Sequence, residues 1–116
     1  MKRDMNLIRQ LLLDLENDNS VDPLGYDEQN IAYHKALLVE SGLAHGDVHT
    51  VVSGEILALV TRLTWEGHEF LDAARDETGW RRVTQVIGET VGTVSLSLLQ
   101  KLLNQWAAQQ FKTLLG

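Results

Sequence analysis

Two histidines and an aspartate lie close together in the sequence and have the side chains of metal ligands. They are His45, Asp47 and His49. The residues around them favour a β-strand, in which side chains four positions apart share one face but lie about 13 Å apart, too far for bonds of about 2.1 Å to one ion. Only a turn at Gly46 and Asp47 would bring the two histidines together. We therefore predict a polar entry to a hairpin here, with no metal site and no cofactor.

The block from Trp65 to Glu69 contains two further side chains of types that act in acid–base chemistry, Glu66 and His68, which are close in sequence. At the start of a helix, Glu66 would complement the positive end of the helix dipole. We predict that His68, like His34, is a hydrogen-bonded structural histidine inside a helix. The sequence contains no nucleophile elbow, phosphate-binding loop, dinucleotide loop or zinc-protease motif, so we predict a non-enzymatic protein without a small-molecule substrate.

The net charge of −6 is distributed unevenly along the chain. Residues 1–58 contain four basic and ten acidic residues, whereas residues 59–116 contain six of each. A protein that binds DNA through its phosphates needs a basic face, because the neutralisation of phosphates by basic side chains supplies most of the non-specific affinity. The candidates for contacts with a nucleic-acid backbone are Lys2, Arg3, Arg9 and Arg62.

Composition and hydropathy indicate the compartment. Cysteine is absent, so disulfides and thiolate zinc sites are excluded, and a reducing cytoplasm is the expected location. The first residues are charged, and no apolar run has the length of about 18 residues that a membrane span needs. We therefore predict a cytoplasmic protein without a membrane partner, and a length of 116 residues fits a single domain overall.

The first elements that must position these residues are two helices. Apolar residues at three- and four-residue spacing predict helices over residues 4–16 and 27–41. Asp4 and Asp27 are their predicted N-caps, and Gly42 is predicted to end the second helix in a left-handed conformation. The segment between the helices contains the only proline and is expected to be a loop.

The next predicted element is a β-hairpin over residues 43–52 and 56–64. Both stretches are rich in β-branched and aliphatic residues, and they flank Ser53 and Gly54, which favour a tight turn. The expected fold class is therefore mainly α with a small β-hairpin, an α+β fold.

Three further helices are predicted after the hairpin. Thr64 would cap the first, which stops near Gly79, while the second ends at Gly92 and the third reaches from 94 to 115. The ring of Trp65 is expected to be buried at the junction of strand and helix. Its replacement by alanine would then cost about 3–5 kcal/mol.

Four segments resemble those of a known family in their order and spacing. They are Met1-Lys2-Arg3-Asp4-Met5, Tyr33-His34 with Leu37-Leu38, Ser41-Gly42-Leu43, and the long block Arg62-Leu63-Thr64-Trp65-Glu66-Gly67-His68-Glu69-Phe70-Leu71-Asp72. The family is Domain of Unknown Function 2513, small proteins of bacteria and their phages. The resemblance implies a bacterial or phage origin without implying an activity.

The segment 31–43 is similar, more distantly, to the recognition-helix segment of metal-sensing and multidrug-resistance winged-helix repressors. In those proteins a His-x-x-Leu-Leu pattern is followed by an acidic residue, a small residue, Gly and Leu. A strand that runs directly into a helix at residues 62–72, together with this similarity, favours a winged helix-turn-helix-like core over residues 1–78, with the hairpin as the wing. Residues 79–116 would be a C-terminal helical extension that packs on the core or forms a dimer seam.

The second predicted helix carries the candidate recognition or partner face. Its inward side is expected to hold Ile31, His34, Leu37, Leu38 and Ser41. Its outward side is expected to hold Gln29, Tyr33, Ala36 and Glu40. The polar residues of this side, together with two at the start of the helix, form the candidate face: Glu28, Gln29, Asn30, Tyr33 and Glu40. Gln29 and Asn30 can pair with adenine, and the commonest use of the winged-helix fold leads us to predict a regulator that binds DNA. The alternative function is an acidic protein–protein interaction module, such as a phage-encoded inhibitor of a host factor, because the acids would repel phosphates. A helix face that is only solvated is the alternative to base recognition.

The last predicted helix carries a wide apolar stripe that a small domain cannot easily cover. Leucines lie on both sides of this stripe, which favours two neighbouring helices. We predict a homodimer whose seam contains Leu99, Leu103, Trp106, Phe111 and Leu114. The alternative is that this helix packs on the first one and completes the core.

Overall fold

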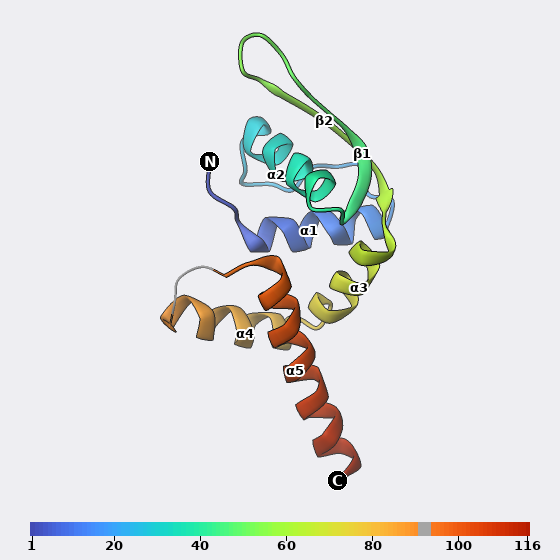
Figure 1. Cartoon of the computed structure of the whole chain (residues 1–116), viewed down its shortest axis with the longest axis vertical. Coiled ribbons are helices and arrows are strands. Elements are labelled where there is room, and N and C mark those ends of the chain that lie inside the picture. Colours follow the sequence, from blue (N-terminus) through green and yellow to red (C-terminus); the bar gives the residue numbers. More distant parts are fainter. Residues whose placement is uncertain (91–93) are drawn as a thin grey trace. The chain divides into compact units, whose positions relative to one another are not determined.

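The computed structural model describes residues 1–90 and 94–116. Within these residues the chain is mainly helical and carries one two-stranded antiparallel sheet (Figure 1). This confirms the predicted fold class, whereas the winged-helix assignment stays a prediction. The elements in chain order are α1 (Met5–Glu16), α2 (Glu28–Glu40), β1 (Ala44–Thr50), β2 (Ile56–Leu63), α3 (Trp65–Ala74), α4 (Glu77–Thr90) and α5 (Leu96–Leu115).

The contacts between residues divide the chain into two compact units, Met1–Leu71 and Asp72–Gly116. The division falls inside α3. The first unit contains α1, α2 and the hairpin, and the second contains α4 and α5. The predicted subdivision into residues 1–78 and 79–116 stays a prediction. None of the helices in the described ranges is both long and apolar enough to span a bilayer.

The two N-terminal helices begin at the predicted capping residues. The Asp4 carboxylate accepts hydrogen bonds from two amides of the first turn of α1 at 2.9 and 3.3 Å. The Asp27 carboxylate accepts from the Asn30 amide at 2.8 Å. Gly42 follows α2 with a φ of +80°, the left-handed conformation that commonly ends a helix. These boundaries of the prediction are confirmed.

α2 packs against α1 and also against both strands of the hairpin. Ile31, His34 and Leu38 are buried, as predicted. Ala36 is buried as well, so the prediction that it points outward is wrong, and Ser41 is exposed although it was expected inward. Both strands of the hairpin pack against α2, so a second side of this helix is covered, which a pattern based on one apolar stripe cannot anticipate. Ser41 is the C-cap beyond the last residue of α2, and its hydroxyl donates to the Leu38 carbonyl at 3.2 Å.

The hairpin contains a bulge near its base. The pairing shifts between His45 and Gly46, and the Thr61 hydroxyl donates to the His45 carbonyl at 3.1 Å. Gly46 lies against the backbone of β2, where a Cβ atom would overlap a carbonyl oxygen. His45, Asp47 and His49 alternate along β1 as exposed residues, so they form an extended row and do not converge.

Thr64 ties the start of α3 to the end of α2. Its hydroxyl donates to the Gly42 carbonyl at 2.6 Å and accepts from the Gly67 amide at 2.9 Å. The Thr64 amide donates to the Leu43 carbonyl at 3.0 Å. Gly67 approaches the same Leu43 oxygen so closely that a Cβ atom would overlap it. The predicted N-cap role of Thr64 is therefore confirmed, and this junction depends on a glycine at position 67.

Two predictions about the start of α3 are wrong. Trp65 is 75% exposed, and His68 is exposed instead of being enclosed by apolar neighbours. The buried side of α3 contains Gly67, Phe70 and Leu71. At about 100° per residue, Trp65 lies about 160° around the helix from Gly67. The ring therefore extends away from the buried side.

Replacing Trp65 by alanine is consequently expected to change the free energy of unfolding by less than about 1 kcal/mol, because the exposed ring has little packing to lose. Denaturant unfolding of the two proteins measures this difference. A loss of about 3 kcal/mol or more would mean that the ring is buried in solution.

In the second unit, α4 and α5 pack against each other. α3 ends at Ala74, and the Asp76 carboxylate accepts from the Gly79 amide at 3.0 Å in the first turn of α4. Gly79 therefore lies inside α4, and the prediction that a helix stops there is wrong. Its lack of a side chain serves close packing, since a Cβ atom would lie 2.6 Å from the ring of Trp106. The predicted helix end at Gly92 lies outside the described residues.

The residues of the predicted dimer seam differ in exposure. Leu99 and Leu103 are each 1% exposed, and the half-buried Trp106 ring lies against α4. Phe111 and Leu114 near the end of α5 are 64% and 85% exposed. Leu99 and Leu103 are therefore already buried within a single chain. The end of α5, in contrast, presents apolar side chains to solvent. The homodimer itself stays a prediction.

Candidate partner-binding site beside the hairpin

The predicted recognition face of α2 is only partly accessible. Glu28 and Glu40 are exposed, whereas Gln29, Asn30 and Tyr33 are half-buried. The two exposed acids lie at opposite ends of the helix. α2 therefore does not present these five side chains as one open polar surface.

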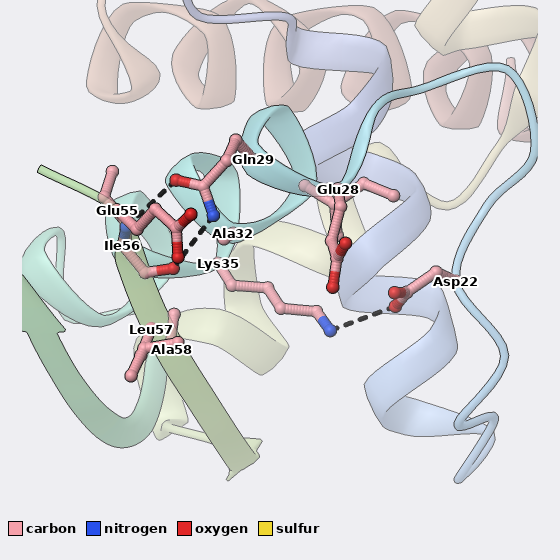
Figure 2. A pocket seen from close by; sticks show the side chains of 10 residues that line it. Asp22, Glu28, Gln29, Ala32, Lys35, Glu55, Ile56, Leu57 and Ala58 are labelled. Atoms are coloured by element: carbon pink, nitrogen blue, oxygen red, sulfur yellow. Dashed lines mark hydrogen bonds and ion pairs between the residues drawn. The ribbon is translucent and has the colours of Figure 1, made fainter. Parts of the chain in front are cut away.

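Gln29 binds the hairpin. Its amide nitrogen donates to the Ile56 carbonyl at 3.2 Å, and its amide oxygen accepts from the Ile56 amide at 2.9 Å (Figure 2). A neighbouring antiparallel strand would make the same two hydrogen bonds with one residue. The Gln29 side chain thus takes the place of a strand at the start of β2.

An open pocket lies next to this contact, between α2, the preceding loop and β2 (Figure 2). Its volume is about 290 Å³. The Lys35 ammonium bonds to the Asp22 carboxylate at 3.0 Å, and this ion pair joins α2 to the loop. The other residues that line the pocket are Glu28, Gln29, Ile31, Ala32, Glu55, Ile56, Leu57 and Ala58.

The pocket and its surroundings are acidic. Asp22, Glu28 and Glu55 carry three negative charges at the pocket, against the single positive charge of Lys35. The first unit contains twelve acidic and five basic residues, a net charge of −7, whereas the second contains four acidic and five basic residues. The site therefore attracts a cationic group more readily than a phosphate.

The four basic residues predicted to contact a nucleic-acid backbone are not equally accessible. Lys2, Arg3 and Arg62 are exposed. Arg9 is half-buried and already interacts within the chain. Three of the four are therefore available for a contact with phosphate.

A buried cluster holds the start of α1 to α2. The His34 side chain is fully buried, its Nε2 accepts from the Asp4 amide at 2.8 Å, and its Nδ1 lies 2.8 Å from the Asn30 carbonyl oxygen. An acceptor role at Nε2 and a carbonyl beside Nδ1 together assign the proton to Nδ1. The predicted structural role of His34 is confirmed.

Tyr26 belongs to the same cluster. Partial burial, followed by the negative charge of Asp4 and a hydrogen bond to its side chain, raises the pKa of Tyr26 above the usual value of 10.0. Asp4 therefore caps α1 and accepts from Tyr26 through its side chain, while its amide donates to His34. These contacts join the first helix, the loop and the second helix.

The Tyr26 contact gives stability a dependence on alkaline pH. Because the pKa is raised in the folded state, this stabilisation is complete below the usual tyrosine pKa and is lost as the pH rises through the folded-state value. Tyr26→Phe is expected to lower the free energy of unfolding by about 0.5–1.5 kcal/mol at neutral pH, and by less at strongly alkaline pH. Denaturant unfolding at both pH values measures this, with Tyr33→Phe as the matched control. An equal effect of Tyr26→Phe at both pH values would contradict the assignment.

The chain matches the family model described as Hypothetical protein (DUF2513) over residues 2–93. The chain belongs to this family. An uncharacterised protein of Haemophilus influenzae is 32% identical over 109 residues, which cover 88% of this chain and 92% of that protein. No solved structure matches the chain.

The four segments on which the resemblance to this family rests meet in pairs in the first unit. Asp4 in the first segment bonds to His34 in the second, and Gly42 in the third bonds to Thr64 in the fourth. These four segments therefore contain residues that hold this unit together. They do not include Gln29 or the other residues around the pocket, although both lie within the residues 2–93 that the family model matches.

The candidate face predicted from the sequence includes Glu28 and Gln29 but none of the other residues that form the pocket. These residues come from a loop, a helix and a strand, so no single periodicity connects them. The predicted turn at Ser53 and Gly54 was the one usable signal, because it fixes which residues of β2 pair with β1. It carries no information about what lies at the other edge of β2.

Proposed function

We propose that this protein is a non-enzymatic interaction module of a bacterium or phage, and that it binds a basic protein partner at the pocket beside β2. The proposal is carried by the position of Gln29, which is bonded to Ile56 within an acidic pocket. A reducing cytoplasm suits a chain without cysteine and is the compartment we propose.

Two physical arguments favour a protein partner over DNA at this face of α2. Gln29 would have to give up both partly buried hydrogen bonds to Ile56 before it could pair with a base. Glu28 and its acidic neighbours would then lie close to phosphates. A basic protein segment leaves Gln29 in place and has the charge opposite to that of the pocket.

The second candidate function is that of a winged-helix regulator that binds DNA. It is favoured by the order of α2 followed by a hairpin and by the exposure of Lys2, Arg3 and Arg62. With three phosphate contacts, affinity would fall with salt at a log–log slope of about −2.7, since each contact contributes about −0.9.

Fluorescence anisotropy with a labelled lysine-rich peptide and a labelled non-specific DNA duplex separates the two candidates. At about 150 mM salt, where the Debye length is about 8 Å, we expect the peptide to bind and the duplex not to bind detectably. Glu28→Lys is expected to weaken peptide binding more than Glu40→Lys, a matched control that changes the net charge equally at the other end of α2. Duplex binding that is lost in Arg62→Glu would support the regulator instead.

A further inference from the structure

We propose that the free edge of β2 at Ala58 accepts an extended segment of the partner, containing lysine or arginine, as an added β-strand. This inference rests on the proposed function and specifies how the partner is bound. In such complexes, main-chain hydrogen bonds supply affinity, and pockets for alternate side chains supply specificity.

The direction of the main-chain groups along β2 follows from two contacts. The Val51 amide donates to the Glu55 carbonyl at 3.0 Å, so the main-chain carbonyl of Glu55 points toward β1. Ile56 directs both its amide and its carbonyl to Gln29 on the opposite side. Because these directions alternate along an antiparallel strand, the amide and the carbonyl of Ala58 also point away from β1.

The space beside this edge is open. Ile56, Leu57 and Ala58 line the pocket on the strand side, while Ala32 and Lys35 line it on the α2 side (Figure 2). Across residues 1–90 and 94–116, no hydrogen bond reaches the main chain of Ala58 from outside the hairpin. An open strand edge of this kind is a ready template for pairing with another chain.

Gln29 marks where an added strand would begin. Its amide already makes at Ile56 the pair of bonds that a strand residue would make. An incoming segment would continue from that point, and the next outward-facing residue, Ala58, lies about 6.8 Å further along an antiparallel strand. The segment can therefore pair with β2 without displacing Gln29.

The charges beside the edge select a basic segment. Glu28 and Glu55 line the pocket, and the positive charge of Lys35 is already paired with Asp22 at 3.0 Å. Alternate side chains of a strand share one face, so a lysine or arginine in the segment can extend toward these acids. The volume of about 290 Å³ is at the lower limit of small-molecule sites and suits a long side chain better than an enclosed ligand.

A short synthetic peptide that alternates valine and lysine is the probe for this site. Its affinity for the full chain, measured by isothermal titration calorimetry, is compared with its affinity for Ala58→Pro. Proline removes the amide that points to the open edge, and it is tolerated at edge positions whose amide faces solvent. We expect Ala58→Pro to bind the peptide at least about tenfold more weakly.

Val48→Pro is the matched control, because Val48 pairs with Ala58 and its amide points to the opposite edge of the hairpin. This variant is expected to bind the peptide as the native chain does. A second measurement covers the case in which Ala58→Pro fails to fold. A peptide N-methylated at alternate residues keeps its lysines but cannot donate to β2, and it should also bind about tenfold more weakly to the native chain.

The outcomes separate this inference from the function on which it rests. Equal binding of the methylated and unmodified peptides, or equal binding by Ala58→Pro and the native chain, would overturn strand addition. Neither result would contradict the proposal that the partner is basic. Slower exchange of the Ala58 amide in the complex, observed by nuclear magnetic resonance, would support strand addition. Failure of the lysine peptide to bind, or equal binding of a peptide with glutamate in place of lysine, would overturn both proposals.

Discussion

Replacing Gly67 by alanine is expected to lower the free energy of unfolding by about 3 kcal/mol or more. The added methyl group would overlap the Leu43 carbonyl oxygen, and that oxygen is held in place by the Thr64 amide at 3.0 Å. Relief of the overlap would move α3 away from the end of α2 and disturb the bonds that Thr64 makes there. Denaturant unfolding of the variant and the native chain measures the loss.

Gly88→Ala is the matched control for this substitution. Gly88 lies inside α4, and in the described part of the chain no atom apart from its neighbours and the backbone of its own helix lies within 4 Å of the position that its Cβ would take. Alanine is therefore expected to raise stability there by about 0.5–1 kcal/mol through its better helix propensity. A Gly67→Ala variant as stable as the native chain would show that the close approach of Gly67 and Leu43 is absent in solution.

His34→Ala is expected to lower the free energy of unfolding by about 3–4 kcal/mol. The substitution empties the space of a fully buried ring and leaves the Asp4 amide without the acceptor that now lies 2.8 Å away. Because Asp4 is the N-cap of α1, we expect the first turn of α1 to lose amide-exchange protection before the rest of the helix.

The control for His34 is the exposed histidine of α3. His68→Ala removes the same side chain at a solvent-exposed position and is expected to change stability by less than about 0.5 kcal/mol. Similar losses in the two variants would contradict the difference in burial between His34 and His68. Thermal unfolding of both variants under one set of conditions is sufficient for the comparison.

The helix ends and the hairpin can be predicted from sequence because their causes are local. Asp4 and Asp27 bond to amides two or three residues further along the chain. Gly42 has a backbone conformation that residues other than glycine rarely adopt. Each of these features depends on a few neighbouring residues, so the sequence contains nearly all the information needed.

The candidate site could not be predicted because its contacts are distant in sequence. Gln29 and Ile56 are 27 positions apart, and no local pattern indicates that the amide of Gln29 would pair with a strand. Trp65 shows a different limit. Phe70 and Leu71 mark the buried side of α3, and helix geometry places Trp65 on the opposite side, so its exposure could have been predicted; a large aromatic ring is instead expected in the core from its type alone.

The contact between Gln29 and Ile56 also affects how copies of this protein behave when they are concentrated. An uncovered strand edge invites aggregation, and here a side chain occupies the first position of that edge. If the β2 edges of two copies approached each other, Glu28 and Glu55 of one copy would meet the same carboxylates of the other and repel them. The acids that would admit a basic segment therefore oppose the pairing of identical chains through this edge, and this repulsion weakens at about 1 M salt, where the Debye length falls to about 3 Å.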